Sequence, residues 1–117
     1  MTTKPAQQVH LRSLMTKLIA MRTVTEDTLA CREAIEWVKH QVSDLPLLVT
    51  DLTYNEHPAL VLSTRDTLQP KVLLLAHLDV VPAPLEMFDL KIQDGRYLGR
   101  GVFDMKGIVA TDRKSVV

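Results

Sequence analysis

The stretch Lys71–Gly107, KVLLLAHLDVVPAPLEMFDLKIQDGRYLGRGVFDMKG, decides the expected fold. It opens with an apolar run, residues 72–76, that ends abruptly at His77. A short apolar run bounded by polar residues is typical of a strand buried on both faces. We therefore predict a buried central strand over Lys71–Ala76 in an α/β sheet. Ligands collect beyond the carboxyl ends of such strands, which is where His77 and Asp79 lie.

The spacing of three polar residues suggests a metal site. Residues two apart on an extended chain point the same way, so His77 and Asp79 can share one face. A metal-binding imidazole usually donates its other N–H to a carboxylate or carbonyl, a role open to Asp79. Asp104, from the next loop, could add an anionic oxygen. Catalytic zinc commonly takes three protein ligands and a water, so His77 and Asp104 would form an incomplete site.

Each of these residues also has a simpler interpretation. A histidine after an apolar strand is often only a hydrogen-bonded structural residue. Asp79 alone could be a turn residue or a helix cap, and Asp104 could cap a helix that begins near Lys106. Arg100 and Lys106 are expected to face solvent, a salt bridge or a helix end rather than substrate.

Two motifs carry a resemblance to a known family. The segments HLDVVPA at His77–Ala83 and DGRYLGRGVFDMKG at Asp94–Gly107 resemble the first half of the active site of the M20 (M20/M25/M40) metallopeptidases. That family includes aminoacylases, carboxypeptidases, dipeptidases and succinyl-diaminopimelate desuccinylases. The resemblance implies a zinc-dependent hydrolase that cleaves peptide or amide bonds, with a small peptide or an N-acyl amino acid as substrate.

The resemblance also assigns roles to single residues. It implies that His77 binds one metal, that Asp79 is the catalytic carboxylate that positions this histidine, and that Asp104 bridges two Zn²⁺ ions. Co²⁺ or Mn²⁺ could replace zinc. It further implies a cis peptide bond between Asp104 and Met105. The loop Pro84–Asp89 is shorter than in many relatives, which limits what can be inferred about substrate.

The family pattern extends beyond what this sequence contains. Its general base, a Glu-Glu pair, and its remaining metal ligands have no counterpart here, nor has its lid or dimerisation domain. We therefore expect residues 1–111 to be the N-terminal part of a three-layer α/β catalytic domain, truncated partway through its sheet and inactive by itself. The complete parent could be a homodimer.

The last six residues, DRKSVV at 112–117, have two explanations. The DNA that would encode them, GAT CGG AAG AGC GTC GTG, resembles a common sequencing adaptor, so we expect an assembly artefact. The alternative is a genuine hydrophilic tail.

Composition excludes several classes of protein. Lys+Arg and Asp+Glu are both 14, so no charge excess favours nucleic acid. The single Cys31 rules out an internal disulfide and is expected to be a core residue. No apolar run approaches the length of a membrane span, and no secretory leader is evident. We expect a cytoplasmic protein without a nucleic-acid or membrane partner, in which His10, His40 and His57 lie at the surface.

Periodicity predicts the remaining elements. Two amphipathic helices are expected, one over about 7–22 and one from a capping box at Thr23–Glu26 to about Val42. Their apolar stripes are Leu11, Leu14, Met15, Leu18 and Met21, then Cys31, Ala34, Ile35, Val38 and Val42. Strands are expected over Leu47–Tyr54, Ala59–Thr64, Leu90–Gln93 and Arg96–Leu98, with turns at Asn55–Pro58 and Asp94–Gly95.

Two rival functions remain open on the sequence alone. The chain could be a short natural protein that binds a partner or a metal without catalysis. It could also be a gene remnant without a stable fold, which a cooperative urea transition would exclude.

Overall fold

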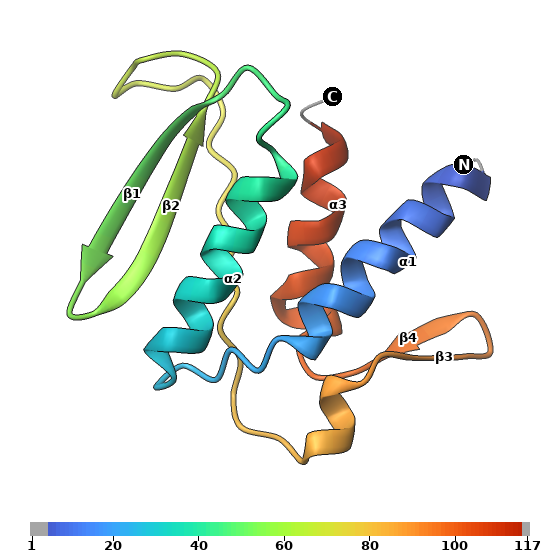
Figure 1. Cartoon of the computed structure of the whole chain (residues 1–117). Coiled ribbons are helices and arrows are strands. Elements are labelled where there is room, and N and C mark those ends of the chain that lie inside the picture. The colour runs from blue at the N-terminus through green and yellow to red at the C-terminus, as the bar shows by residue number, and fades with distance from the viewer. Residues whose placement is uncertain (1–4, 116–117) are drawn as a thin grey trace.

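The computed structural model describes residues 5–115, and of residues 113–115 only the backbone. Three helices, two separate hairpins and a long extended segment make up this part of the chain (Figure 1). Residues 116–117 of the predicted artefactual tail lie outside the described residues. The regular elements are α1 Pro5–Ala20, α2 Thr28–Gln41, β1 Leu48–Tyr54, β2 His57–Ser63, β3 Lys91–Gln93, β4 Arg96–Leu98 and α3 Gly107–Ser115.

The core forms where α1 packs against α3. Its buried members are Leu14, Met15, Leu18, Ile19 and Ala110, and partly buried side chains such as Trp37 and Tyr97 pack around them. The predicted stripe of α1 is confirmed at Leu14, Met15 and Leu18. Ile19 joins that stripe, whereas the helix ends before Met21.

The predicted capping box is wrong. Helix α2 begins at Thr28, and its N-cap is Asp27, whose carboxylate accepts a hydrogen bond from the Ala30 N–H at 3.0 Å. The preceding residues form a bridge at Val24 and then a turn at Thr25–Glu26, which the Asp27 N–H closes on the Val24 carbonyl at 2.8 Å. Val24 forms a parallel bridge with Val80, because the backbone of Thr23–Thr25 pairs with the chain beside Val80 rather than starting a helix.

Both predicted hairpins are present. Strands β1 and β2 pair antiparallel from Leu48 opposite Ser63 to Tyr54 opposite His57. The turn is tighter than predicted, because Asn55 and Glu56 both adopt positive φ, 47° and 68°, and close it as a two-residue loop. Strands β3 and β4 pair around the predicted turn Asp94–Gly95, and both turn residues have positive φ.

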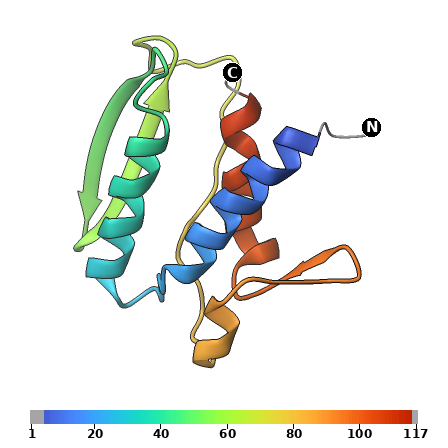
Figure 2. The ribbon, with the colours of Figure 1, turned by 45° about the vertical axis from the view of Figure 1, so that its right-hand side comes forward.

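The predicted buried strand at Lys71–Ala76 is wrong. The segment is extended but lies outside both two-stranded sheets, and residues 72–75 are 63–84% exposed. The chain continues from it without a helix or strand as far as the short 3₁₀ helix Leu85–Phe88 (Figure 2). Burial on both faces requires neighbouring strands and covering layers, and within residues 5–115 no strand pairs with this run.

The described chain is thus a small mixed domain of helices and strands, compatible with the α/β class. Within residues 5–115, no helix is both long enough and apolar enough to cross a membrane.

Candidate metal site

The structure brings His77, Asp79 and Asp104 together. His77 lies near the end of the extended segment, and Asp104 lies in the irregular turn Val102–Lys106 that precedes α3. The His77 Nε2 atom is 2.9 Å from Asp104 Oδ1. Its Nδ1 atom is 3.0 Å from the Asp79 carbonyl oxygen and 3.3 Å from Asp79 Oδ1. The Asp104–Met105 peptide bond is cis, as the resemblance implied.

Both ring nitrogens of His77 therefore face oxygen acceptors. Partial burial lowers the pKa of His77, but the hydrogen bond to the Asp79 carbonyl, the hydrogen bond to Asp104 and the two negative charges together raise it above 6.5. A neutral imidazole carries one proton and has one lone pair. With the proton on Nδ1, the lone pair of Nε2 points toward the Asp104 carboxylate.

Thr25 is a site residue that the sequence reasoning missed. Its hydroxyl donates a hydrogen bond of 2.7 Å to Asp79 Oδ2. The signal was present as the pattern Thr23-Val24-Thr25, in which alternate residues point the same way on an extended chain. The Thr23 hydroxyl donates to the Leu78 carbonyl at 2.6 Å, so one hydroxyl holds the backbone just before Asp79 and the other holds the Asp79 carboxylate.

Of the two places expected for Lys106, solvent is wrong and a helix end is confirmed. Lys106 is fully buried, and its ammonium donates to the Leu18 carbonyl at 2.8 Å and the Met21 carbonyl at 2.7 Å. It thereby caps the carboxyl end of α1, where the helix dipole favours a cation. Burial lowers the pKa of Lys106 to about 8. Because Lys106 follows Asp104 by two residues, this anchor fixes the turn that carries Asp104.

Gly101 makes room for that buried lysine. Its φ is +86°, and an added Cβ would lie 2.8 Å from Val80 Cγ1 and 3.2 Å from Lys106 Cδ. The side chain of the neighbouring Arg100 is partly buried, and its Nε has no hydrogen-bond partner within the described residues. The solvent or salt-bridge contact expected for Arg100 is therefore not made at that atom.

His77 and Asp104 fit part of a metal site. Two donors held by zinc at 2.0–2.1 Å in a tetrahedron lie about 3.3 Å apart, so the observed 2.9 Å needs only a small opening. Imidazole nitrogen and carboxylate oxygen are also zinc donors. Within residues 5–115, no three His, Cys, Asp or Glu side chains are grouped so that they could hold a metal. Asp79 faces Thr25 and the far side of the ring, where it can position His77.

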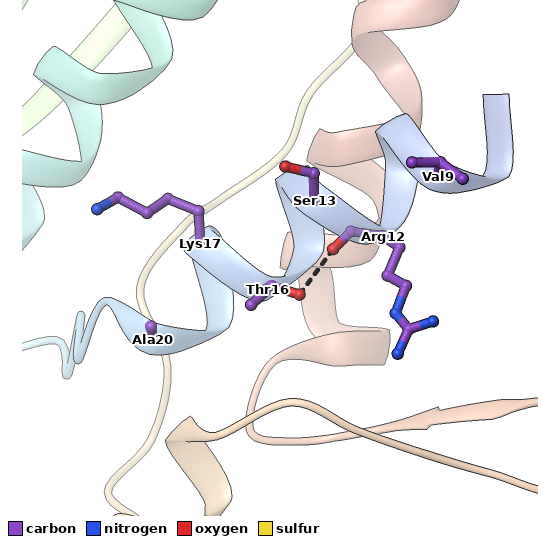
Figure 3. Close-up of a pocket in the computed structure, with 6 residues that line it drawn as sticks. All are labelled: Val9, Arg12, Ser13, Thr16, Lys17 and Ala20. Atoms are coloured by element: carbon purple, nitrogen blue, oxygen red, sulfur yellow. Dashed lines mark hydrogen bonds between the residues drawn. The ribbon is translucent and has the colours of Figure 1, made fainter. Parts of the chain in front are cut away.

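The surface hollows lie elsewhere. One follows the outer face of α1 and is lined by α1 residues only (Figure 3). A second lies between α2 and the β1–β2 hairpin. None of the three candidate residues lines either hollow. The lining residues of the first are Val9, Arg12, Ser13, Thr16, Lys17 and Ala20.

Comparison with known proteins points to the same residues. The family model of peptidase family M20/M25/M40 matches residues 73–111, which include His77, Asp79 and Asp104. A cysteinylglycine-S-conjugate dipeptidase from Corynebacterium striatum is 34% identical to the chain over 88 residues. The segment that carries the three candidate residues thus matches the M20 peptidase family. The match to the dipeptidase covers 66% of this chain but only 19% of that relative.

Proposed function

We propose that this chain supplies the first ligands of a divalent-metal site in a hydrolase of peptide or amide bonds. The observation that carries the proposal is the approach of His77 Nε2 to Asp104 Oδ1 at 2.9 Å, inside the segment that matches the family. These two atoms belong to residues 27 apart in sequence, and the intervening hairpin and turn bring them face to face.

The residues divide the work by position. His77 and Asp104 would hold the metal, which when bound lowers the pKa of a water molecule and polarises the scissile carbonyl. Asp79 keeps the ring proton of His77 on Nδ1, so that Nε2 presents its lone pair. The Asp104 side chain is 76% exposed, which leaves its second oxygen accessible to another partner. That exposure supports the bridging role that the resemblance implies.

The finer parts of the proposal rest on the family. The metal is proposed to be zinc, two ions per complete site, with Co²⁺ or Mn²⁺ as substitutes. The substrate is proposed to be a small peptide or an N-acyl amino acid, and the complete protein a cytoplasmic enzyme with a three-layer α/β catalytic domain. His77 and Asp104 need further ligands and a general base, so the 117-residue chain alone is expected to be inactive.

A chimera tests this function. The aligned segment of the Corynebacterium striatum dipeptidase would be replaced by that of this chain, and metal-dependent dipeptide hydrolysis would be measured. Activity that the His77→Ala substitution abolishes supports the proposal. A chimera that folds and binds Zn²⁺ through His77 yet hydrolyses neither dipeptides nor N-acyl amino acids would count against it. Turnover by the isolated chain would contradict its expected inactivity.

The exposed apolar segment favours a second candidate, a binding module. Residues 72–75 present aliphatic side chains on both faces, carry no charge and belong to neither sheet. Such a segment can accept a strand by backbone hydrogen bonding. Because the formal charge of the chain is zero, a second copy is the occupant proposed. Analytical ultracentrifugation of the wild type and of Leu74→Lys tests this second candidate. If the segment pairs with a second copy, the wild type is a dimer and the added lysine charge makes the variant a monomer.

A further inference from the structure

Thr25 and Asp79 are far apart in sequence but share a short hydrogen bond. The Thr25 hydroxyl donates to Asp79 Oδ2 at 2.7 Å, while Asp79 Oδ1 faces His77 Nδ1 at 3.3 Å. We propose that Thr25 is a positioning residue of the metal site: it fixes the Asp79 carboxylate so that its other oxygen faces His77. This inference rests on the proposed function, since it concerns the same site.

The backbone makes Thr25 suited to this role. The Thr25 N–H donates to the Val80 carbonyl at 3.2 Å, and the Val80 N–H donates to the Thr23 carbonyl at 2.8 Å. Val24 and Val80 form a parallel bridge between these bonds. The donor and the acceptor of the Thr25–Asp79 hydrogen bond are therefore carried by two segments that are already fastened to each other.

A carboxylate needs such a partner to keep one orientation. The terminal torsion of aspartate is broad, so an unfixed Asp79 carboxylate can rotate away from His77. A hydroxyl that donates to an ionised carboxylate forms one of the stronger hydrogen bonds in proteins. Threonine also holds its hydroxyl firmly, because branching at Cβ restricts χ1. Thr25 thus fixes Oδ2 and leaves Oδ1 for the imidazole.

The orientation of Asp79 matters because His77 has two competing acceptors. In the neutral ring, a proton on Nδ1 donates to the Asp79 backbone carbonyl at 3.0 Å and has the carboxylate oxygen Oδ1 beside it at 3.3 Å, whereas a proton on Nε2 donates to Asp104 Oδ1 at 2.9 Å. Only the first tautomer leaves the Nε2 lone pair free for a metal. By keeping the Asp79 carboxylate beside Nδ1, Thr25 adds a negative charge that favours a proton on Nδ1 and therefore the metal-competent tautomer.

The test compares three variants of the 117-residue chain. Thr25→Val removes the hydroxyl and keeps the shape, and Thr25→Ser restores a hydroxyl. Thr23→Val is the matched control, because its hydroxyl bonds the Leu78 carbonyl and not Asp79. The ¹⁵N shifts of the neutral His77 ring report the tautomer ratio, with His10, His40 and His57 as exposed internal references. Zn²⁺ titration reports the affinity of the site.

In Thr25→Val, we expect His77 to shift at least about twofold toward the Nε2–H tautomer. Zn²⁺ affinity should fall about three- to tenfold, less than the 10–100-fold typical of losing a direct partner of the ligand. Thr25→Ser should restore both properties, and Thr23→Val should leave the tautomer ratio unchanged.

Each failure has a separate meaning. If Thr25→Val matches the wild type in both measurements while His77→Ala abolishes Zn²⁺ binding, the role of Thr25 is overturned and the proposed function stands. If His77 never binds Zn²⁺ but the tautomer shifts in Thr25→Val alone, the proposed function falls and the positioning contact stands. A serine that fails to restore the wild-type ratio also overturns the inference. If Thr25→Val does not fold, Thr25→Ala replaces it, and its tautomer ratio and Zn²⁺ affinity are compared with those of Thr25→Ser in the same way.

Discussion

Lys106 makes the stability of the chain depend on pH in an unusual direction. Its pKa falls from 10.5 to about 8 because the ammonium is fully buried. Between these two values the unfolded chain holds a proton that the folded chain has lost. The free energy of unfolding must therefore rise as pH increases through this window.

The size of the effect follows from the same pKa values. Each pKa unit corresponds to about 1.4 kcal/mol, so a fall from 10.5 to about 8 corresponds to about 3 kcal/mol. Below about pH 8 both states carry the charge, and this contribution no longer changes. Burial raises the pKa of the Cys31 thiol, which contributes with the opposite sign at alkaline pH.

Urea unfolding followed by circular dichroism measures this dependence. The Lys106→Met variant keeps Cys31, so the difference between wild type and variant isolates the lysine. That difference should grow in favour of the wild type by about 3 kcal/mol from about pH 8 to about pH 10.5. The matched control is Lys17→Met, since Lys17 is exposed on α1. Curves for wild type and Lys106→Met that stay parallel across this range would refute the reasoning.

Three further predictions concern local structure and metal binding. Gly101→Ala should lower the free energy of unfolding by at least about 2 kcal/mol in urea, since its φ is +86° and its Cβ would meet a valine methyl at 2.8 Å. Gly95→Ala, with φ +74° but open space, should cost only about 1 kcal/mol, so equal losses would contradict the packing argument. Asp27→Ala should lower the free energy of unfolding by about 1 kcal/mol because it removes the N-cap of α2, whereas Glu26→Ala should leave it unchanged. A larger loss in Glu26→Ala than in Asp27→Ala would support the capping box instead. Zn²⁺ affinity measured by calorimetry should fall as pH drops through the raised pKa of His77, because a proton and the metal compete for Nε2. A Zn²⁺ affinity that does not depend on pH would exclude His77 as a ligand.

The sequence allowed the helices, both hairpins and the three candidate residues to be predicted. Helical spacing indicated the buried side chains Leu14 and Leu18, and Asp94–Gly95 indicated its turn. These features depend on local patterns, so they are readable along the chain. The grouping of His77, Asp79 and Asp104 came from motifs whose order fits the observed contacts.

What could not be predicted depends on partners distant in sequence. Thr23–Glu26 has the local form of a capping box, but its hydroxyls bond Leu78 and Asp79, 54–55 residues away. Nothing near Lys106 in sequence indicates that its ammonium would reach Leu18 and Met21. The apolar run at 72–75 has the pattern of a strand that is buried inside a sheet. Burial also requires neighbouring strands, and the pattern of the run does not indicate whether they are present.

The central claim is that His77 and Asp104 together bind a divalent metal. Zn²⁺ titration of the ¹⁵N-labelled 117-residue chain, followed at the histidine ring nitrogens, tests it most directly. We predict a saturable change at His77 Nε2 that leaves His10, His40 and His57 unaffected, is lost in His77→Ala and is weakened in Asp104→Ala. If Zn²⁺ produced no saturable change at His77, or affected all four histidines alike, the claim would be contradicted.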